Sequence, residues 1–385
     1  MHQTSTVTTA EPAVAQPAPV RRLVSLDTLR GFDMFWIMGG EEIFHVLAKT
    51  TGWAWAIFMA EQFVHPDWNG FSPYDLIFPL FLFMAGVSTP FSIGSRLEKG
   101  ASKSELARKI ITRGLVLVLL GIIYNNGLFT TPIHEMRFPS VLARIGMAGM
   151  FAQLIYVYAG RRAQYGWFAG ILLGYWAMLM LIPVPGCGAG VLTMECSLVG
   201  YVDRLLVPGH LYKTVHDPEG LMSTVPAIAN ALLGIFAGTL LRSDGRTFGQ
   251  ERKTVLLVLA GAACLIVGWA WSFVFPLNKN LWTSSFMLVT GGLSLLLLAL
   301  FYWVIDVKQI KRWTTFFVVI GMNSILIYLA GDFIDFEHTV KYLFGGLISF
   351  LSSEPAKAVA GVLALLAVKW AFLYFLYRKK VFLRV

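Results

Sequence analysis

One histidine of this chain stands in a sequence context suited to proton transfer. His65 opens a tight aromatic turn, residues 65–70 (HPDWNG), and Asp75 follows at the start of a long apolar segment. An imidazole takes and returns a proton near neutral pH, and a neighbouring carboxylate can fix its tautomer and orientation. The same pattern also has a purely structural interpretation, because an aspartate at a helix start is stabilised by the helix dipole whatever the function.

Charged and amide side chains inside apolar segments form a second group of candidates. A charge buried in hydrocarbon is costly, so such residues are functional candidates by default. The first apolar segment carries Arg30 and Glu41, and the fourth carries Arg144. These groups either form ion pairs within the membrane, for example between Arg30 and Asp27, or line a channel filled by water or ligand. The other members of the group are Asp33, Glu42, Arg137, Asn323, Ser324 and Asp332.

The composition defines the scaffold that must position these residues. Of 385 residues, 56% are hydrophobic and only 14% are charged, and the mean hydropathy is +0.65. Soluble domains carry about 25% charged residues, so a soluble globular enzyme and a disordered chain are both excluded. Apolar runs of about 20 residues fit membrane-crossing helices rather than barrel strands. The sequence therefore predicts an all-α, polytopic helical bundle in a lipid bilayer.

Ten membrane spans are predicted, and the basic residues orient them. The 31 Lys and Arg residues fall mostly in alternate loops, which places both termini in the cytoplasm by the positive-inside rule. The net charge of +9 is therefore a topology signal, and no nucleic-acid partner is expected. The predicted spans are residues 29–48, 75–95, 110–128, 139–160, 166–184, 223–242, 254–275, 281–305, 314–333 and 357–377.

The segments outside these spans yield three further expectations. Residues 1–20 predict a disordered cytoplasmic tail, which leaves 21–385 as one transmembrane domain. The two long loops, 49–74 and 185–222, both fall on the outer side, where long loops are often functional. Cys187 and Cys196 share the second loop and form either a disulfide or two unpaired thiols. No histidine lies near them at ligand spacing, so no metal is expected.

Six short strings then carry a resemblance to a known family. In this order along the chain, they resemble the transmembrane acyltransferases of the heparan-α-glucosaminide N-acetyltransferase family. The first string is also loosely similar to acyltransferase type 3 proteins. The strings are residues 22–31 (RLVSLDTLRG), 65–79 (beginning HPDWNG and ending DLIFP), 141–146 (VLARIG), 217–224 (beginning DPEGL), 278–283 (NKNLWT) and 321–325 (GMNSI).

The resemblance implies that an acetyl group passes from cytoplasmic acetyl-CoA to an amino sugar on the far side of the membrane. His65 matches the reacting histidine of the family and would act as base or as nucleophile. Glu41 stands where an amide side chain is found in the lysosomal members, so it would orient His65 or act as a base itself. Asp75 and Asn69 complete the predicted catalytic group, in which Asn69 is one candidate donor to the oxyanion.

Donor binding is assigned to basic and polar side chains, because the chain has no phosphate-binding glycine loop. Arg30 and Arg144 are candidates for the CoA phosphates or pantetheine, and Lys279, on the outer side, suits that role least. The remaining predicted acetyl-CoA contacts are Asn278, Asn280, Trp282, Asn323 and Ser324.

The predicted setting is the inner membrane of a bacterium, with a homodimer as the form that the resemblance implies. An amino-sugar or related metabolite permease is the alternative function, in which the same intramembrane charges line a transport path. A structural or partner-binding membrane protein is the third possibility.

Overall fold

A computed structural model describes residues 23–128, 130–244 and 248–383. The tail predicted at residues 1–20 lies outside the described residues. Within the described part, the regular elements are helices, joined by loops that hold two isolated bridges, so the predicted all-α class is confirmed.

The helices of the first half include the segments that flank the HPDWNG turn. A π-helical segment, Trp36–Gly40, joins α1 to α2, and another, Pro90–Gly94, joins α4 to α5. The helices are α1 (Val24–Phe35), α2 (Glu42–Thr51), α3 (Ala54–Glu61), α4 (Ile77–Thr89), α5 (Ser95–Glu98), α6 (Lys103–Asn126), α7 (Val141–Tyr158), α8 (Arg161–Leu181) and α9 (Leu198–Leu206).

The second half continues the bundle and ends in a long apolar helix. A π-helical segment, Trp303–Val307, extends the helix that precedes it. The helices are α10 (Thr224–Arg242), α11 (Gln250–Ser272), α12 (Ser284–Tyr302), α13 (Thr314–Met322), α14 (Ser324–Phe333), α15 (Phe336–Ser349) and α16 (Glu354–Arg378).

Six helical segments of the described chain are long and apolar enough to cross a membrane. The pair α13–α14, bent by 66° at its break, would make a seventh. The remaining predicted spans, at 29–48, 110–128 and 166–184, are also helical. Ten spans therefore stays a prediction. The six segments are Pro73–Glu98, Val141–Tyr158, Thr224–Arg242, Gln250–Ser272, Ser284–Val307 and Glu354–Arg378.

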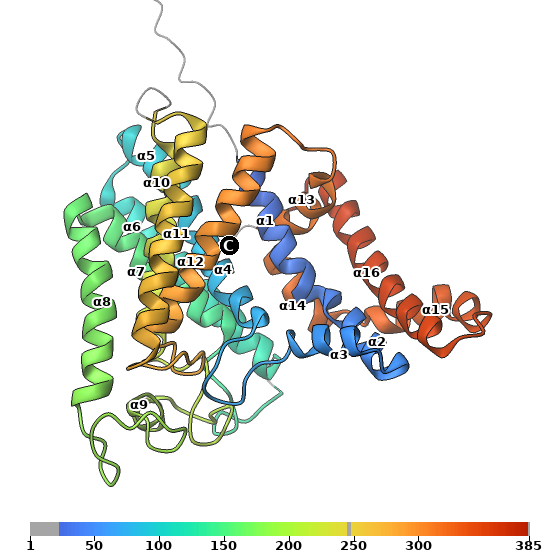
Figure 1. Cartoon of the computed structure of the whole chain (residues 1–385), viewed down its shortest axis with the longest axis horizontal. Coiled ribbons are helices and arrows are strands. Elements are labelled where there is room, and N and C mark those ends of the chain that lie inside the picture. The colour runs from blue at the N-terminus through green and yellow to red at the C-terminus, as the bar shows by residue number, and fades with distance from the viewer. Residues whose placement is uncertain (1–22, 129, 245–247, 384–385) are drawn as a thin grey trace, which may run out of the picture.

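Three helices, α3, α9 and α15, lie outside every predicted span. They are too short or too amphipathic to resemble a span, so hydropathy alone did not distinguish them from loops. Figure 1 shows α9 among the loops at one end of the bundle, with α5 at the other end. The helices α2, α3, α15 and α16 gather on the side of the molecule remote from α8.

The centre of the bundle depends on close contact between α4 and α10. A Cβ atom added at Gly86 of α4 would lie 2.1 Å from the carbonyl oxygen of Ala231, and one at Gly234 of α10 would lie 2.0 Å from that of Phe83. Gly234 and Gly238 form a small-xxx-small stripe of the kind that lets membrane helices approach. This contact fixes α4, the helix that begins directly after Asp75.

Gly234→Leu should therefore destabilise the protein, because the added side chain must separate two backbones in contact. Overpacking of this kind costs about 1–3 kcal/mol or more. The measurement is the thermal unfolding midpoint of the detergent-purified protein. Gly170→Leu on α8 is the matched control, since nothing lies within 4 Å of the Cβ position at Gly170. Equal midpoints for the two variants would contradict the proposed packing role.

Candidate active site

A cavity lined by both polar and apolar side chains lies at the α9 end of the bundle, where six loop and helix segments meet. Its volume is about 490 Å³. His65 reaches it from the HPDWNG turn, and Lys279 reaches it from the loop before α12. The full lining is Ile37, His65, Pro66, Asp67, Tyr74, Ile77, Phe78, Arg137, Val141, Tyr212, Lys213, Pro218, Glu219, Lys279, Asn280 and Tyr328.

His65 and Asp75 are in contact at one wall of this cavity. The Nδ1 atom of His65 lies 2.6 Å from Oδ1 of Asp75, which is fully buried, while the His65 side chain is 44% exposed. The other carboxylate oxygen of Asp75 accepts a hydrogen bond from the backbone N–H of Ser72 at 2.9 Å. Asp75 therefore caps the helix start and contacts the imidazole at the same time, so the two sequence interpretations are compatible.

Lys279 completes a three-residue cluster with these two groups. Its Nζ atom lies 2.8 Å from Nε2 of His65 and 3.5 Å from Oδ1 of Asp75. Burial lowers the pKa of the Lys279 ammonium below its ordinary value, and the nearby Asp75 and Glu219 carboxylates only partly oppose this. No local pattern in the sequence indicates this contact, because Lys279 and His65 lie 214 residues apart.

The HPDWNG turn and the loop before α12 are joined by their own hydrogen bonds. The side chain of Asn278 donates to Oδ1 of Asn69 at 3.0 Å, and its own Oδ1 accepts from the backbone of Leu281 at 2.8 Å. The backbone N–H of Gly70 donates to the carbonyl of Leu277 at 2.8 Å. These bonds hold His65 and Lys279 opposite each other.

Comparison with known proteins gives this site a family context. No protein-family model matches the chain. Two curated relatives are named heparan-alpha-glucosaminide N-acetyltransferase. The human protein is 30% identical over 421 residues, a match that covers 94% of this chain and 60% of the human protein. The mouse protein is 28% identical over 434 residues, which cover 98% of this chain and 63% of the mouse protein.

The chain is a distant relative of these acetyltransferases. The resemblance predicted from the six strings is thus confirmed as a family relationship. The chain spans about 60% of the length of the curated relatives it matches.

Two arginines organise the loop between α9 and α10. Arg137 donates from Nε and Nη2 to the two carboxylate oxygens of Asp217, each at 2.8 Å, and Nη2 also reaches Glu219. Burial acts against both charges, but the pairing outweighs it, so the pKa of Arg137 is raised and that of Asp217 is lowered. This loop supplies Pro218 and Glu219 to the cavity.

Arg144 of α7 is hydrogen-bonded to the same loop. Its side chain is 2% exposed and donates to the Pro218 carbonyl at 2.5 Å and to the Ser223 hydroxyl. Its guanidinium lies 4.7 Å from the centre of the Trp282 ring, and the Trp282 indole donates to Asn230 at 2.8 Å. Arg144 and Trp282, both predicted to bind acetyl-CoA, are therefore buried packing partners that do not line the cavity.

Glu41 approaches His65 through an intermediary. The Tyr74 ring stacks on the His65 ring with centroids 4.9 Å apart, and its hydroxyl donates to Oε1 of Glu41 at 3.4 Å. Asn280 lines the cavity itself. Of the predicted catalytic residues, Asp75 thus contacts His65 directly and Glu41 reaches it through Tyr74, whereas Asn69 is bonded to Asn278 and does not line the cavity.

Three predicted binding residues lie away from the cavity. Arg30 donates to the Ser88 hydroxyl of α4 at 2.9 Å, and its other nitrogen lies 3.5 Å from Asp27. Asn323 lies at the break between α13 and α14, where it bonds the backbone of Val381 and Leu383. Ser324 follows it as the first, buried residue of α14. The fold does not bring these three residues to His65.

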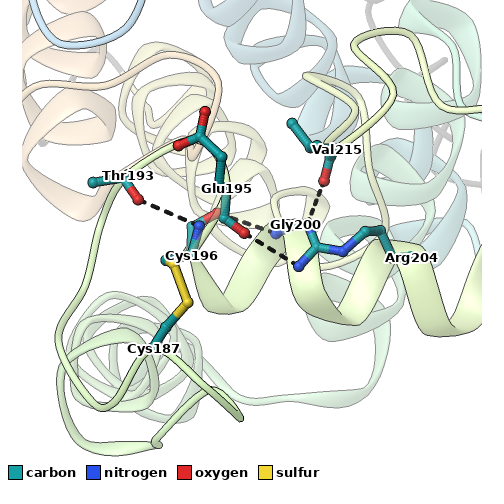
Figure 2. Close-up of a disulfide and its surroundings, with 8 residues drawn as sticks. Cys187, Thr193, Glu195, Cys196, Gly200, Arg204 and Val215 are labelled. Carbon is teal, nitrogen blue, oxygen red and sulfur yellow. Dashed lines mark hydrogen bonds between the residues drawn. A yellow bond between two sulfur atoms is a disulfide. The ribbon is translucent and has the colours of Figure 1, made fainter.

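The disulfide alternative for the two outer cysteines is confirmed, as Figure 2 shows. Cys187 and Cys196 are joined with their Cα atoms 5.7 Å apart. Arg204 ties the end of this loop to the chain near His216, since it donates to the carbonyls of Glu195 and Val215. The carbonyl of Leu192, between the cysteines, accepts from the Trp68 indole at 2.7 Å. The disulfide loop is therefore attached directly to the HPDWNG turn.

Cysteine alkylation tests this arrangement. The unreduced, denatured protein should take up one alkyl group, at Cys264 of α11, because Cys187 and Cys196 are bonded to each other. After reduction it should take up three groups, counted by intact mass. The Cys264→Ala variant is the control and should give zero and then two. Uptake of three groups without reductant would contradict the disulfide.

Proposed function

We propose that this chain is a transmembrane acetyltransferase that moves the acetyl group of cytoplasmic acetyl-CoA to the amine of a glucosamine-type sugar on the outer face. The observation that carries the proposal is the His65–Asp75 pair: its imidazole is exposed to the cavity and its carboxylate is buried. The names of the two relatives support the reaction class and favour an enzyme over the permease alternative.

The reaction needs a base for the amine and a site that binds a thioester beside it. His65 would remove the amine proton during attack on the thioester carbonyl, and would return it to the departing CoA thiolate. In the alternative route His65 attacks first and carries the acetyl group as an acetyl-imidazole. Asp75 supports both routes, because a carboxylate at Nδ1 leaves Nε2 free to react with a substrate.

Residues of α1 and α4 support the proposal that acetyl-CoA reaches the His65 cavity from the cytoplasmic end of the bundle. Met34 and Ile37 of the α1 region and Phe78 and Phe81 of the α4 region line a small apolar pocket that adjoins the outer cavity. Ile37 and Phe78 belong to both spaces. On α4, Ser88 lies ten residues beyond Phe78, or about 15 Å along a helix. A donor with a long thin arm between its acyl group and its charged end fits this separation.

Two arginines at the far end of this face suit the phosphates of such a donor. Arg30 contacts Ser88, and Arg113 of α6 lies close enough to Arg30 for their charges to interact. Asp27, 3.5 Å from Arg30, balances one of these two positive charges, and arginine recognises phosphate with a planar pair of donors. We therefore assign the CoA phosphates to Arg30 and Arg113, in place of Arg144.

The proposed setting follows the charge distribution. Ten spans would put both termini and the basic loops in the cytoplasm and the His65 cavity outside, in a bacterial inner membrane. Residues 21–385 would form one catalytic domain that works as a homodimer. A single domain is supported by the central position of α4, which packs on α1, α7, α10 and α12.

His65→Ala should reduce acetyl transfer by about 10²–10⁴-fold, because the base is lost while Asp75 and the fold remain. The assay incubates purified protein with labelled acetyl-CoA and a panel of glucosamine derivatives. His134→Ala is the matched control, as His134 is 80% exposed in an outer loop. Near wild-type transfer by His65→Ala would move the active site elsewhere.

Arg113→Met should raise the KM for acetyl-CoA and leave the KM for acetyl-pantetheine unchanged, because the truncated donor lacks the phosphates that the arginine would bind. Steady-state kinetics with both donors measure the difference. Arg108→Met, at another exposed arginine of the same helix, should alter neither constant. Equal effects on the two donors would rule out phosphate recognition at Arg113.

A further inference from the structure

The proposed reaction leaves one close neighbour of His65 without a role. Lys279 lines the cavity, and its ammonium lies nearer to the imidazole than any other charged group except Asp75. The inference developed here rests on the proposed function and concerns what this lysine does in it.

The position of Lys279 is fixed by the loop that carries it. On one side Asn278 is fully buried and bonded to Asn69 and Leu281. On the other side the Leu281 carbonyl accepts from the Tyr175 hydroxyl at 2.6 Å, and Trp282 adopts a φ of +51° with a fully buried ring. The backbone at Lys279 is therefore rigid, while its side chain, 20% exposed, ends in the cavity.

The contact with His65 has a direct consequence for the resting enzyme. The Nζ atom lies 2.8 Å from Nε2 and 3.2 Å from Nδ1, so the ammonium lies over the imidazole with Nε2 as the nearer nitrogen. Asp75 lies 2.6 Å from Nδ1 and favours a proton on that nitrogen, which leaves Nε2 as the basic one. The lysine therefore covers the ring beside its basic nitrogen until a substrate displaces it.

The amide side chains that could stabilise an oxyanion are already largely engaged. Asn278 donates to Asn69 and is buried, and Asn323 binds the backbone near the end of the described chain. Among the predicted amide donors, Asn280 lines the cavity. A lysine with a flexible four-carbon stem can move from Nε2 to a carbonyl oxygen placed in the same cavity.

We propose that Lys279 is a third catalytic residue, which covers Nε2 of His65 in the resting enzyme and binds the oxyanion during acetyl transfer. When the acceptor amine takes its place at Nε2, the ammonium moves to the thioester carbonyl oxygen. The amine nitrogen forms a bond to the carbonyl carbon while its proton passes to Nε2. The negative charge on the oxygen is held by Lys279 until the C–S bond breaks, and the thiolate takes the proton back from His65.

This role requires that the surrounding charges keep Lys279 in the site. Asp75 attracts its ammonium from the turn before α4 and Glu219 attracts it from the α9–α10 loop, while Arg144 of α7 repels it. Asp67, Arg137 and Lys213 face His65 across the same cavity, and Tyr74 covers one face of its ring. The ammonium is the nearest positive charge, so its removal should ease protonation of the imidazole.

The first test compares Lys279→Met with Lys279→Arg in the acetyl-transfer assay. The methionine variant should lose about 10²–10³-fold in kcat, the usual loss for one oxyanion donor, with little change in the KM for acetyl-CoA. The acid limb of its pH profile should move up by about one pH unit, as expected when a neighbouring positive charge is lost. The arginine variant should keep the acid limb of the wild type. A kcat and a pH profile equal to wild type in Lys279→Met would overturn the proposal.

The second test does not depend on turnover. Diethyl pyrocarbonate modifies neutral imidazole, and peptide mass spectrometry measures its rate at His65 with His134 as an internal control. His65 should react at least several-fold faster in Lys279→Met than in wild type at pH 8, while His134 should react equally in both. Equal rates at His65 would refute the covering role. Absence of acetyl transfer by the wild type would instead refute the proposed function.

Discussion

The cavity at His65 is organised by one buried carboxylate. Asp75 is fully buried at the start of α4, and a charge in that position is tolerated only with close partners. One of its oxygens caps the helix start through Ser72, and the other faces His65 and Lys279. Because the buried carboxylate of Asp75 needs hydrogen-bond and charge partners, it fixes the positions of the imidazole, the lysine and the helix start together.

The same carboxylate ties the chemistry to the packing of the membrane helices. The α4 backbone lies against α10 through Gly86, Gly234 and Gly238, where no larger side chain fits. Between membrane helices such packing replaces the hydrophobic effect as the source of stability. The α4 helix and the turn before it then hold Asp75 just before the helix, Phe78 and Phe81 in its first two turns and Ser88 near its last residue. The geometry at both ends of the proposed donor path is thus set by one helix.

Buried arginines and a disulfide support the loops that complete the cavity. Arg137 and Arg144 hold the α9–α10 loop, and the Cys187–Cys196 loop holds the HPDWNG turn through Trp68. The sequence alone makes Arg30 and Arg144, which lie in apolar segments, candidates for binding acetyl-CoA. For Arg144 the structural interpretation explains its contacts better, although its partners are a carbonyl, a hydroxyl and a ring rather than a carboxylate.

The sequence by itself determined the helical class, the approximate positions of the long helices, the family and the pairing of His65 with Asp75. These features are local, since apolar runs of about 20 residues and a turn ten residues before a helix need no distant partner to be recognised. Only the tertiary structure decided that Lys279 contacts His65, that Arg144 supports a loop, and that α13 and α14 bend by 66° at Asn323. Those outcomes depend on contacts between residues 74 to 214 positions apart or on a break within an apolar run. Hydropathy carries no information about which buried polar groups meet, because that choice is made by the packing of the whole bundle.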